Sequence, residues 1–181
     1  MFKKLKGLYW AVASKIGGKF TNQHYVFQLD KPNFPQPDAN YIIRGYANFS
    51  ELPATLIPAK LMDAEIIQQK FSDQEHFYVL TTRDGTVGSF FWVKTGRQLK
   101  DWFIRLKDED RIAYSGYTAR EMRGKKLIAH VWRVAVESEK VSADHWYADC
   151  HIYNKPAYTY LIRSGFKMIG KIRGRLKAEV I

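Results

Sequence analysis

The sequence predicts a single α/β domain in which helices flank a mixed β-sheet, and three observations support this fold class. Residues 111–166 read in order as strand, basic turn, amphipathic helix, strand and capped helix. Asp84-Gly85 separates two apolar runs, which is a strong signal for an antiparallel hairpin. A composition of 46% hydrophobic residues over 181 positions favours one folded domain and argues against disorder.

The first 20 residues are predicted to form a separate basic amphipathic segment ahead of a domain that spans residues 21–181. They contain five lysines and no acidic residue, around an apolar patch at residues 8–13. Three interpretations are open: a solvated basic helix packed on the domain, a segment lying on an anionic membrane, and a signal peptide.

Four strands are predicted before residue 111. Residues 25–29 favour a short strand, and residues 41–44 favour the first strand of the main domain. Residues 77–81 and 87–93 favour the two strands of the hairpin. The start of the chain is therefore expected to supply an antiparallel part of the sheet.

Two stretches between these strands are less regular. Residues 49–71 have a helical pattern that Pro53 and Pro58 interrupt. The inward face of this pattern is expected to contain Leu61, Met62, Ile66 and Ile67. Residues 96–110 favour a surface connection whose aromatic residues pack on the sheet, and the alternative is a short helix or a flap.

A basic turn follows the predicted strand at residues 111–118. Apolar residues recur at helical spacing from Leu127 to Val136, so the turn is the start of a helix with one buried face. A helix start exposes unpaired amide groups and a partial positive charge. The cations around this start are Arg120, Arg123, Lys125 and Lys126. The turn is therefore a favourable place for a phosphate group.

The next block predicts a strand, a capped helix and a stop. In the strand at residues 145–152, alternation places His145, Tyr147, Asp149 and His151 on one face. Asn154 is expected to cap a short helix, which Gly165 ends. After residue 166 apolar and basic residues alternate, which predicts a terminal hairpin with Gly170 or Gly174 near its bend.

These two blocks together resemble the GCN5-related N-acetyltransferases, the GNAT superfamily. The family signature is a strand, an Arg/Gln-x-x-Gly-x-Gly/Ala turn at a helix start, another strand and an Asn-x-x-Ala…Gly-Phe block. The matching residues are Arg123, Gly124, Lys125, Asn154, Ala157, Gly165 and Phe166. The resemblance covers mainly residues 111–166 and implies a mixed, mostly antiparallel twisted sheet flanked by helices.

Three positions depart from the signature. The fourth residue of the turn, normally glycine, is Lys126, and the sixth, normally small, is Ile128. The family's usual tyrosine acid is replaced by Leu161, with Tyr160 one residue earlier. Glycines allow a pyrophosphate to approach the backbone closely. Lys126 therefore either compensates by pairing with phosphate or indicates a damaged site.

The resemblance implies acetyl-coenzyme A or another acyl-coenzyme A as co-substrate, and a net charge of +11 agrees with an anionic partner. The implied contacts to the acyl and pantetheine portion are Gly116, Tyr117 and Thr118. The implied pyrophosphate contacts are Arg123, Gly124, Lys125, Lys126, Leu127 and Ile128, with Asn154 as a further cofactor residue. No metal-ligand spacing occurs, so no metal is expected.

Three side chains are candidates for proton transfer. Asp149 lies five residues before Asn154, where some family members carry a glutamate base, and its alternative role is a structural ion pair. His151 is the second candidate base, because histidine titrates near neutral pH, and its alternative role is structural. Tyr160 is the candidate acid. Cys150 is expected to be a small buried residue that is not a nucleophile.

The sequence thus predicts an N-acyltransferase, most simply an N-acetyltransferase, that moves an acyl group directly from coenzyme A to an amine. One expected acceptor is an amino sugar of a surface-polysaccharide or lipid-linked precursor, and a protein amine or a polyamine is the alternative. A single cysteine fits a reducing compartment, so we expect a cytoplasmic location, with peripheral contact to the inner face of the membrane as an option. The alternative function is an inactive GNAT-like domain that binds nucleic acid or an anionic membrane through its basic face.

Overall fold

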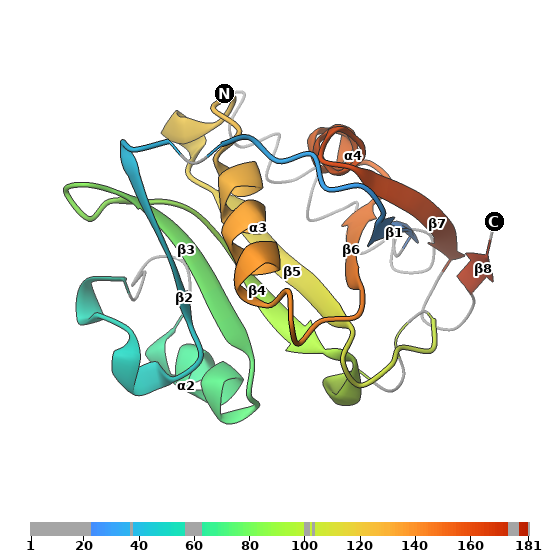
Figure 1. The fold of residues 1–181 in the computed structure, drawn as a ribbon, viewed down its shortest axis with the longest axis horizontal. Helices are drawn as coiled ribbons and strands as arrows, with labels where there is room; N and C mark the ends of the chain where they lie inside the picture. The colour runs from blue at the N-terminus through green and yellow to red at the C-terminus, as the bar shows by residue number, and fades with distance from the viewer. Residues whose placement is uncertain are drawn as a thin grey trace, which may run out of the picture.

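The computed structural model describes residues 23–36, 38–56, 63–99, 102, 104–173 and 178–180, so the predicted basic segment at residues 1–20 lies outside the described residues. In the described part, one sheet has the strand order β2-β3-β4-β5-β6-β1-β7-β8 (Figure 1). Its strands are β1 (Gln23–Leu29), β2 (Tyr41–Tyr46), β3 (His76–Thr82), β4 (Val87–Thr95), β5 (Arg111–Thr118), β6 (Trp146–His151), β7 (Phe166–Arg173) and β8 (Ala178–Val180). Neighbouring strands are antiparallel except β5 and β6, which confirms a mixed, mostly antiparallel sheet.

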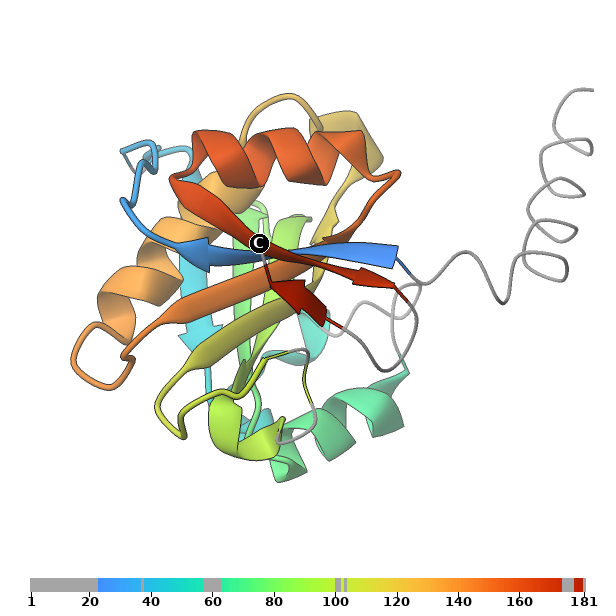
Figure 2. The ribbon, with the colours of Figure 1, turned by 90° about the vertical axis from the view of Figure 1, so that its right-hand side faces the viewer.

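Helices cover both faces of this sheet. The helices are α2 (Ala64–Ser72), α3 (Leu127–Ser138) and α4 (Lys155–Arg163), and short 3-10 turns are η1 (Phe49–Glu51), η2 (Ala54–Leu56), η3 (Gly96–Gln98) and η4 (Arg120–Met122). Figure 2 shows α4 above the sheet and α2 below it. Phe91 of β4 packs with Trp132 of α3 in the core cluster between the sheet and the helices α3 and α4. The next residue of β4, Trp92, packs on the other face with Ile67 and Phe71 of α2. Successive side chains of β4 therefore point to opposite faces of the sheet and pack into two separate cores.

The most important difference from the sequence prediction concerns β1. We expected residues 41–44 to supply the first strand of the main domain, but β1 lies inside the sheet between β6 and β7. Val26 and Phe27 are fully buried there. The pairing joins residues about 120 positions apart, and no local pattern in the sequence indicates such a partner.

One smaller prediction was wrong, and a second was confirmed in part. Ile66 is 48% exposed, because α2 begins only at Ala64 and buries the pair Ile67 and Phe71, which are four residues apart. The predicted terminal hairpin is formed by the antiparallel strands β7 and β8. Gly170 is not at its bend, since it lies within β7 and pairs with β1 and β8. Leu61, Met62 and Gly174, which were part of the same predictions, lie outside the described residues.

Gly165 joins the end of α4 to the loop after β1. Its φ is +93°, and its carbonyl accepts hydrogen bonds from the amides of Asp30 and Lys31 at 3.1 Å each. A Cβ at this position would lie 1.7 Å from the carbonyl oxygen of Lys31. The glycine that ends the helix is thus also required by the close approach of the β1 segment.

Replacing Gly165 with alanine is expected to destabilise the fold by about 2 to 3 kcal/mol, from backbone strain and the clash with Lys31. Gly85→Ala is the matched control: Gly85 also has a positive φ, +88°, but no atom of the described residues lies within 4 Å of its Cβ position. The control should therefore cost only about 1 kcal/mol. Urea denaturation of both variants measures the difference, and equal losses would contradict the close approach.

Candidate active site

A cleft opens where the two parallel strands separate. β5 and β6 pair only through Arg111–Trp146, Ile112–Tyr147 and Ala113–Ala148. Beyond these pairs β5 stays on β4 and β6 stays on β1. Within the described residues, the edges of residues 114–118 and 149–151 that face each other do not pair, and a cleft of about 650 Å³ lies between them. Unpaired strand edges offer backbone donors and acceptors to an extended ligand.

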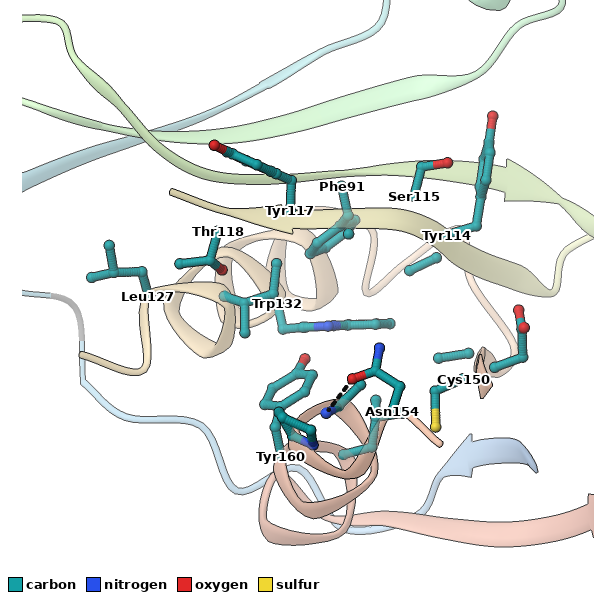
Figure 3. Close-up of a pocket in the computed structure, with 18 of the residues that line it drawn as sticks. Phe91, Tyr114, Ser115, Tyr117, Thr118, Leu127, Trp132, Cys150, Asn154 and Tyr160 are labelled. Carbon is teal, nitrogen blue, oxygen red and sulfur yellow. Dashed lines mark hydrogen bonds between the residues drawn. The ribbon is translucent and has the colours of Figure 1, made fainter. Parts of the chain in front are cut away.

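A β-bulge shapes the β5 side of the cleft. Phe90 and Trp92 of β4 lie opposite Tyr117 and Tyr114, so β5 has one extra residue in this interval. Ser115 takes up the irregularity with a φ of 51°. Figure 3 shows Tyr114 and Tyr117 leaving β5 on the side away from Trp132. A bulge frees backbone groups from the ladder at this point, in the stretch predicted to hold the acyl and pantetheine portion.

The basic turn lies at one end of the cleft. Arg123, Gly124 and Lys126 line it, together with Leu127 and Ile128 at the start of α3. Among the described residues no side chain caps the N-terminus of α3, where Lys126 is the N-cap residue, so its first amide groups can meet an anion. The Nε of Arg123 donates a hydrogen bond to the carbonyl of Thr118 at 3.2 Å, which ties the turn to the end of β5.

The backbone of the turn keeps a glycine-like conformation at Lys126, where the family signature normally has glycine. Lys126 has a φ of 59° and a ψ of 22°, which is the left-handed conformation that glycine favours. Gly124, two residues earlier, also has a positive φ of +84°. The turn therefore keeps its glycine-like backbone and gains a cation beside the cleft. Lys125 is exposed and is not among the residues that line the cleft.

The other two positions that depart from the family signature, Ile128 and Leu161, lie on the inner wall of the cleft. Ile128 and Gly116 both line the cleft, and the Cδ1 of Ile128 lies 4.0 Å from the position that a Cβ on Gly116 would occupy, which is an ordinary contact distance. Leu161 is buried in the core cluster beneath α3. Tyr160 lines the cleft, and burial raises the pKa of its enclosed hydroxyl well above the usual value. In Figure 3 this hydroxyl points toward Trp132.

Asn154 and Cys150 take the structural roles expected of them. The Asn154 side chain accepts a hydrogen bond from the amide of Ala157 at 3.2 Å and caps α4 at the cleft (Figure 3). Cys150 is buried, and burial together with the neighbouring Asp149 charge raises the pKa of its thiol to about 11. The thiol therefore stays protonated near neutral pH, as expected of a packing residue.

The β6 side of the cleft contains both candidate bases and a third residue that the sequence did not indicate. Asp149 and His151 line the cleft, and so does His24 from β1. The Oδ2 of Asp149 lies 2.5 Å from the Nδ1 of His24. The rings of His24 and His151 meet edge to face, with centroids 5.4 Å apart. Only the position of β1 inside the sheet brings His24 to this site.

None of the described helices is both long and apolar enough to cross a membrane. Among the described residues, no group of three or more histidine, cysteine, aspartate or glutamate side chains is arranged to hold a metal ion.

The mixed sheet, the splayed parallel strands and the flanking helices together define the GNAT fold, which comparison with known proteins confirms. No family model and no curated protein matches the sequence. A tandem GNAT protein from the clavulanic acid biosynthesis pathway superposes with a TM-score of 0.57 at 13% identity, over 87% of this chain and 55% of that chain. A GNAT-family acetyltransferase from Colwellia psychrerythraea gives 0.57 at 12% identity, over 81% and 52%.

A third similar structure is a functionally unknown conserved protein from Staphylococcus epidermidis, with a TM-score of 0.53 at 8% identity, over 89% of this chain and 64% of that one. This chain therefore spans between about half and two thirds of the length of the structures it matches. At these identities the likeness shows the fold.

Proposed function

We propose that this protein is an acyl-coenzyme A-dependent N-acyltransferase, most simply an N-acetyltransferase. The observation that carries the proposal is the continuity of the cleft between β5 and β6 with the basic, uncapped start of α3. An acyl-coenzyme A has a long polar arm between a reactive thioester and a pyrophosphate. An unpaired strand edge that leads to an anion-binding turn matches both parts.

In this proposal the pantetheine arm lies along the edge of β5 at Gly116, Tyr117 and Thr118. The pyrophosphate meets the amide groups that begin α3 and the cations Arg123 and Lys126. Lys126 then compensates for the glycine that it replaces, because its backbone is already left-handed and its charge is added to the turn. Lys125 contributes to the positive field from outside the cleft.

The proposed chemistry is direct transfer. The acceptor nitrogen attacks the thioester carbonyl, a C–N bond forms, and the C–S bond breaks as the thiolate leaves. The amine must lose a proton, and the candidate bases for this step are Asp149 and His151 on β6. The leaving thiolate must gain a proton, and Tyr160, which lines the cleft, is the proposed donor.

For the acceptor we propose an amino sugar of a surface-polysaccharide or lipid-linked precursor, met at the inner face of the membrane. The support for this choice is that the first 20 residues contain five lysines and no acidic residue, which favours contact with an anionic membrane surface. A protein amine and a polyamine are the competing acceptors, and the net charge of +11 disfavours a polycation.

A thiol-release assay tests the proposal. The purified protein is incubated with acetyl-coenzyme A and, separately, with D-glucosamine, with a peptide that has a free N-terminal alanine, and with spermidine. We expect amine-dependent release of coenzyme A, strongest with the amino sugar. If none of the three amines accelerates thiol release above the rate without protein, the proposed activity is wrong.

A further inference from the structure

We infer that His24 is the base that takes the proton from the acceptor amine, and that Asp149 positions it. This inference rests on the proposed acyl transfer and names the residue that performs its proton-transfer step. The sequence suggested Asp149 or His151 acting from β6 alone. The structure adds a side chain from a strand at the other end of the chain.

The sheet register fixes the arrangement of the three side chains. His24 pairs with His151 and Val26 pairs with Asp149, so His24 and Asp149 are diagonal neighbours on one face of two antiparallel strands. The alternate residues of β1, Tyr25 and Phe27, pack against Tyr158 of α4 with centroids 5.3 and 5.7 Å away. His24 and Asp149 therefore lie on the sheet face opposite α4.

This placement gives the acyl-coenzyme A and the acceptor amine different sides of the sheet. The anion-binding turn belongs to the α3 side of the sheet, whereas the histidine–aspartate pair lies on the other face of the same cleft. A coenzyme lying between β5 and β6 would present its thioester to an amine that arrives from the His24 side. The base would then meet the attacking nitrogen on the face from which it approaches.

The contact with Asp149 selects the form of the imidazole that can act. An ionised carboxylate only accepts hydrogen bonds, so the Nδ1 of His24 carries the proton of the 2.5 Å contact. The basic lone pair of the neutral ring is then on Nε2. When Nε2 takes the amine proton, the imidazolium that forms lies against the Asp149 carboxylate, which stabilises its charge. The proton thus passes from the amine to Nε2, while Asp149 keeps accepting the hydrogen bond from Nδ1 and does not itself take the proton.

A purely structural role explains the pair less well. The His24 and Asp149 side chains are 26% and 21% exposed and line the cleft. A partly exposed contact between a histidine and a carboxylate contributes little to folding stability. Variants at either position are therefore expected to fold, which keeps the inference testable by kinetics.

The central variant is His24→Asn, whose amide keeps a donor near the position of Nδ1 but has no basic nitrogen. His145→Asn is the matched control, because His145 also contacts an aspartate, Asp110 at 3.2 Å, and does not line the cleft. Thiol release with the best of the three amines gives kcat, and calorimetric titration with acetyl-coenzyme A gives Kd and confirms folding. His24→Ala is assayed with and without added imidazole.

We expect His24→Asn to lower kcat by at least about 100-fold while Kd for acetyl-coenzyme A stays within about twofold. Added imidazole should restore part of the turnover of His24→Ala, which a structural role would not allow. The control His145→Asn should remain close to wild type. If the wild type is active and His24→Asn keeps more than a tenth of the wild-type kcat, the role inferred for His24 is wrong, but the proposed function stands. A wild type that releases no coenzyme A with any amine would overturn the proposed function and this inference with it.

Discussion

Replacing Asp149 with asparagine is expected to lower kcat by roughly 10² to 10⁴-fold, with acetyl-coenzyme A affinity nearly unchanged. The asparagine side chain has the same size but lacks the charge that fixes the His24 proton on Nδ1 and stabilises the imidazolium. Asp149 does not belong to the basic turn, so the binding of the pyrophosphate should not depend on it. Thiol-release kinetics and calorimetry on the same preparation measure the two quantities.

The double variant Asp149→Asn with His24→Asn shows whether the two residues act as one catalytic unit or as two independent groups. If the pair acts as a unit, the double variant should fall little further than the more damaging single change. If the loss of kcat in the double variant equals the product of the two single fold losses, Asp149 and His24 act independently. A wild-type kcat in Asp149→Asn would exclude this carboxylate from proton transfer altogether.

Replacing Arg111 with methionine is expected to destabilise the fold by about 3 to 5 kcal/mol, because it leaves a buried carboxylate without its main counter-charge. The Nε of Arg111 donates to the Oε2 of Glu139, and both side chains are under 10% exposed. The Oε1 of Glu139 accepts from the Tyr78 hydroxyl at 2.7 Å and from the Nδ1 of His76 at 2.9 Å. The cluster joins β3, the end of α3 and the first residue of β5, so it holds the closed end of the cleft.

The same cluster predicts how stability depends on pH. Burial alone would raise the pKa of Glu139, but the hydrogen bonds from His76, Tyr78 and Arg111 lower it overall. A carboxylate with a lowered folded-state pKa stabilises the fold above its unfolded pKa, and this contribution is lost as the pH falls through the folded value. Urea denaturation between pH 3 and about pH 7 measures this loss. In Arg111→Met the loss should shrink or reverse, because removing the guanidinium raises the folded-state pKa of Glu139 and protonation at low pH then relieves the uncompensated charge.

A double variant, Arg111→Met with Glu139→Leu, provides the control for this prediction. Removing both charges leaves no uncompensated carboxylate, so the double variant should be more stable than the sum of the two single losses implies. Strictly additive losses would show that the two side chains do not interact in the folded protein.

Much of the fold follows from local sequence signals. Asp84-Gly85 joins β3 and β4 as expected, α3 buries the predicted apolar face, and Asn154 and Gly165 delimit α4. Each of these features depends on residues within one turn or one hairpin. The position of β1 does not, because its partners lie far along the chain and its own alternation fits many places in a sheet.

The same distinction applies to the site. The basic turn, Asn154 and Asp149 could be located from a motif because their spacing within one βαβ unit is fixed. His24 had no such signal, since its contact with Asp149 spans 125 residues. The left-handed backbone of Lys126 was likewise hidden, because a lysine in that position carries no sign of the conformation that the neighbouring turn imposes.

Calorimetric titration with acetyl-coenzyme A at moderate salt tests the central claim most directly. The comparison uses the wild type, Arg123→Glu at the turn, and Arg163→Glu, which makes the same charge change at the far end of α4 and outside the cleft. We predict micromolar binding by the wild type and Arg163→Glu, and at least tenfold weaker binding by Arg123→Glu. Absence of wild-type binding to acetyl-coenzyme A, or equal weakening by both variants, would contradict a coenzyme site at the start of α3.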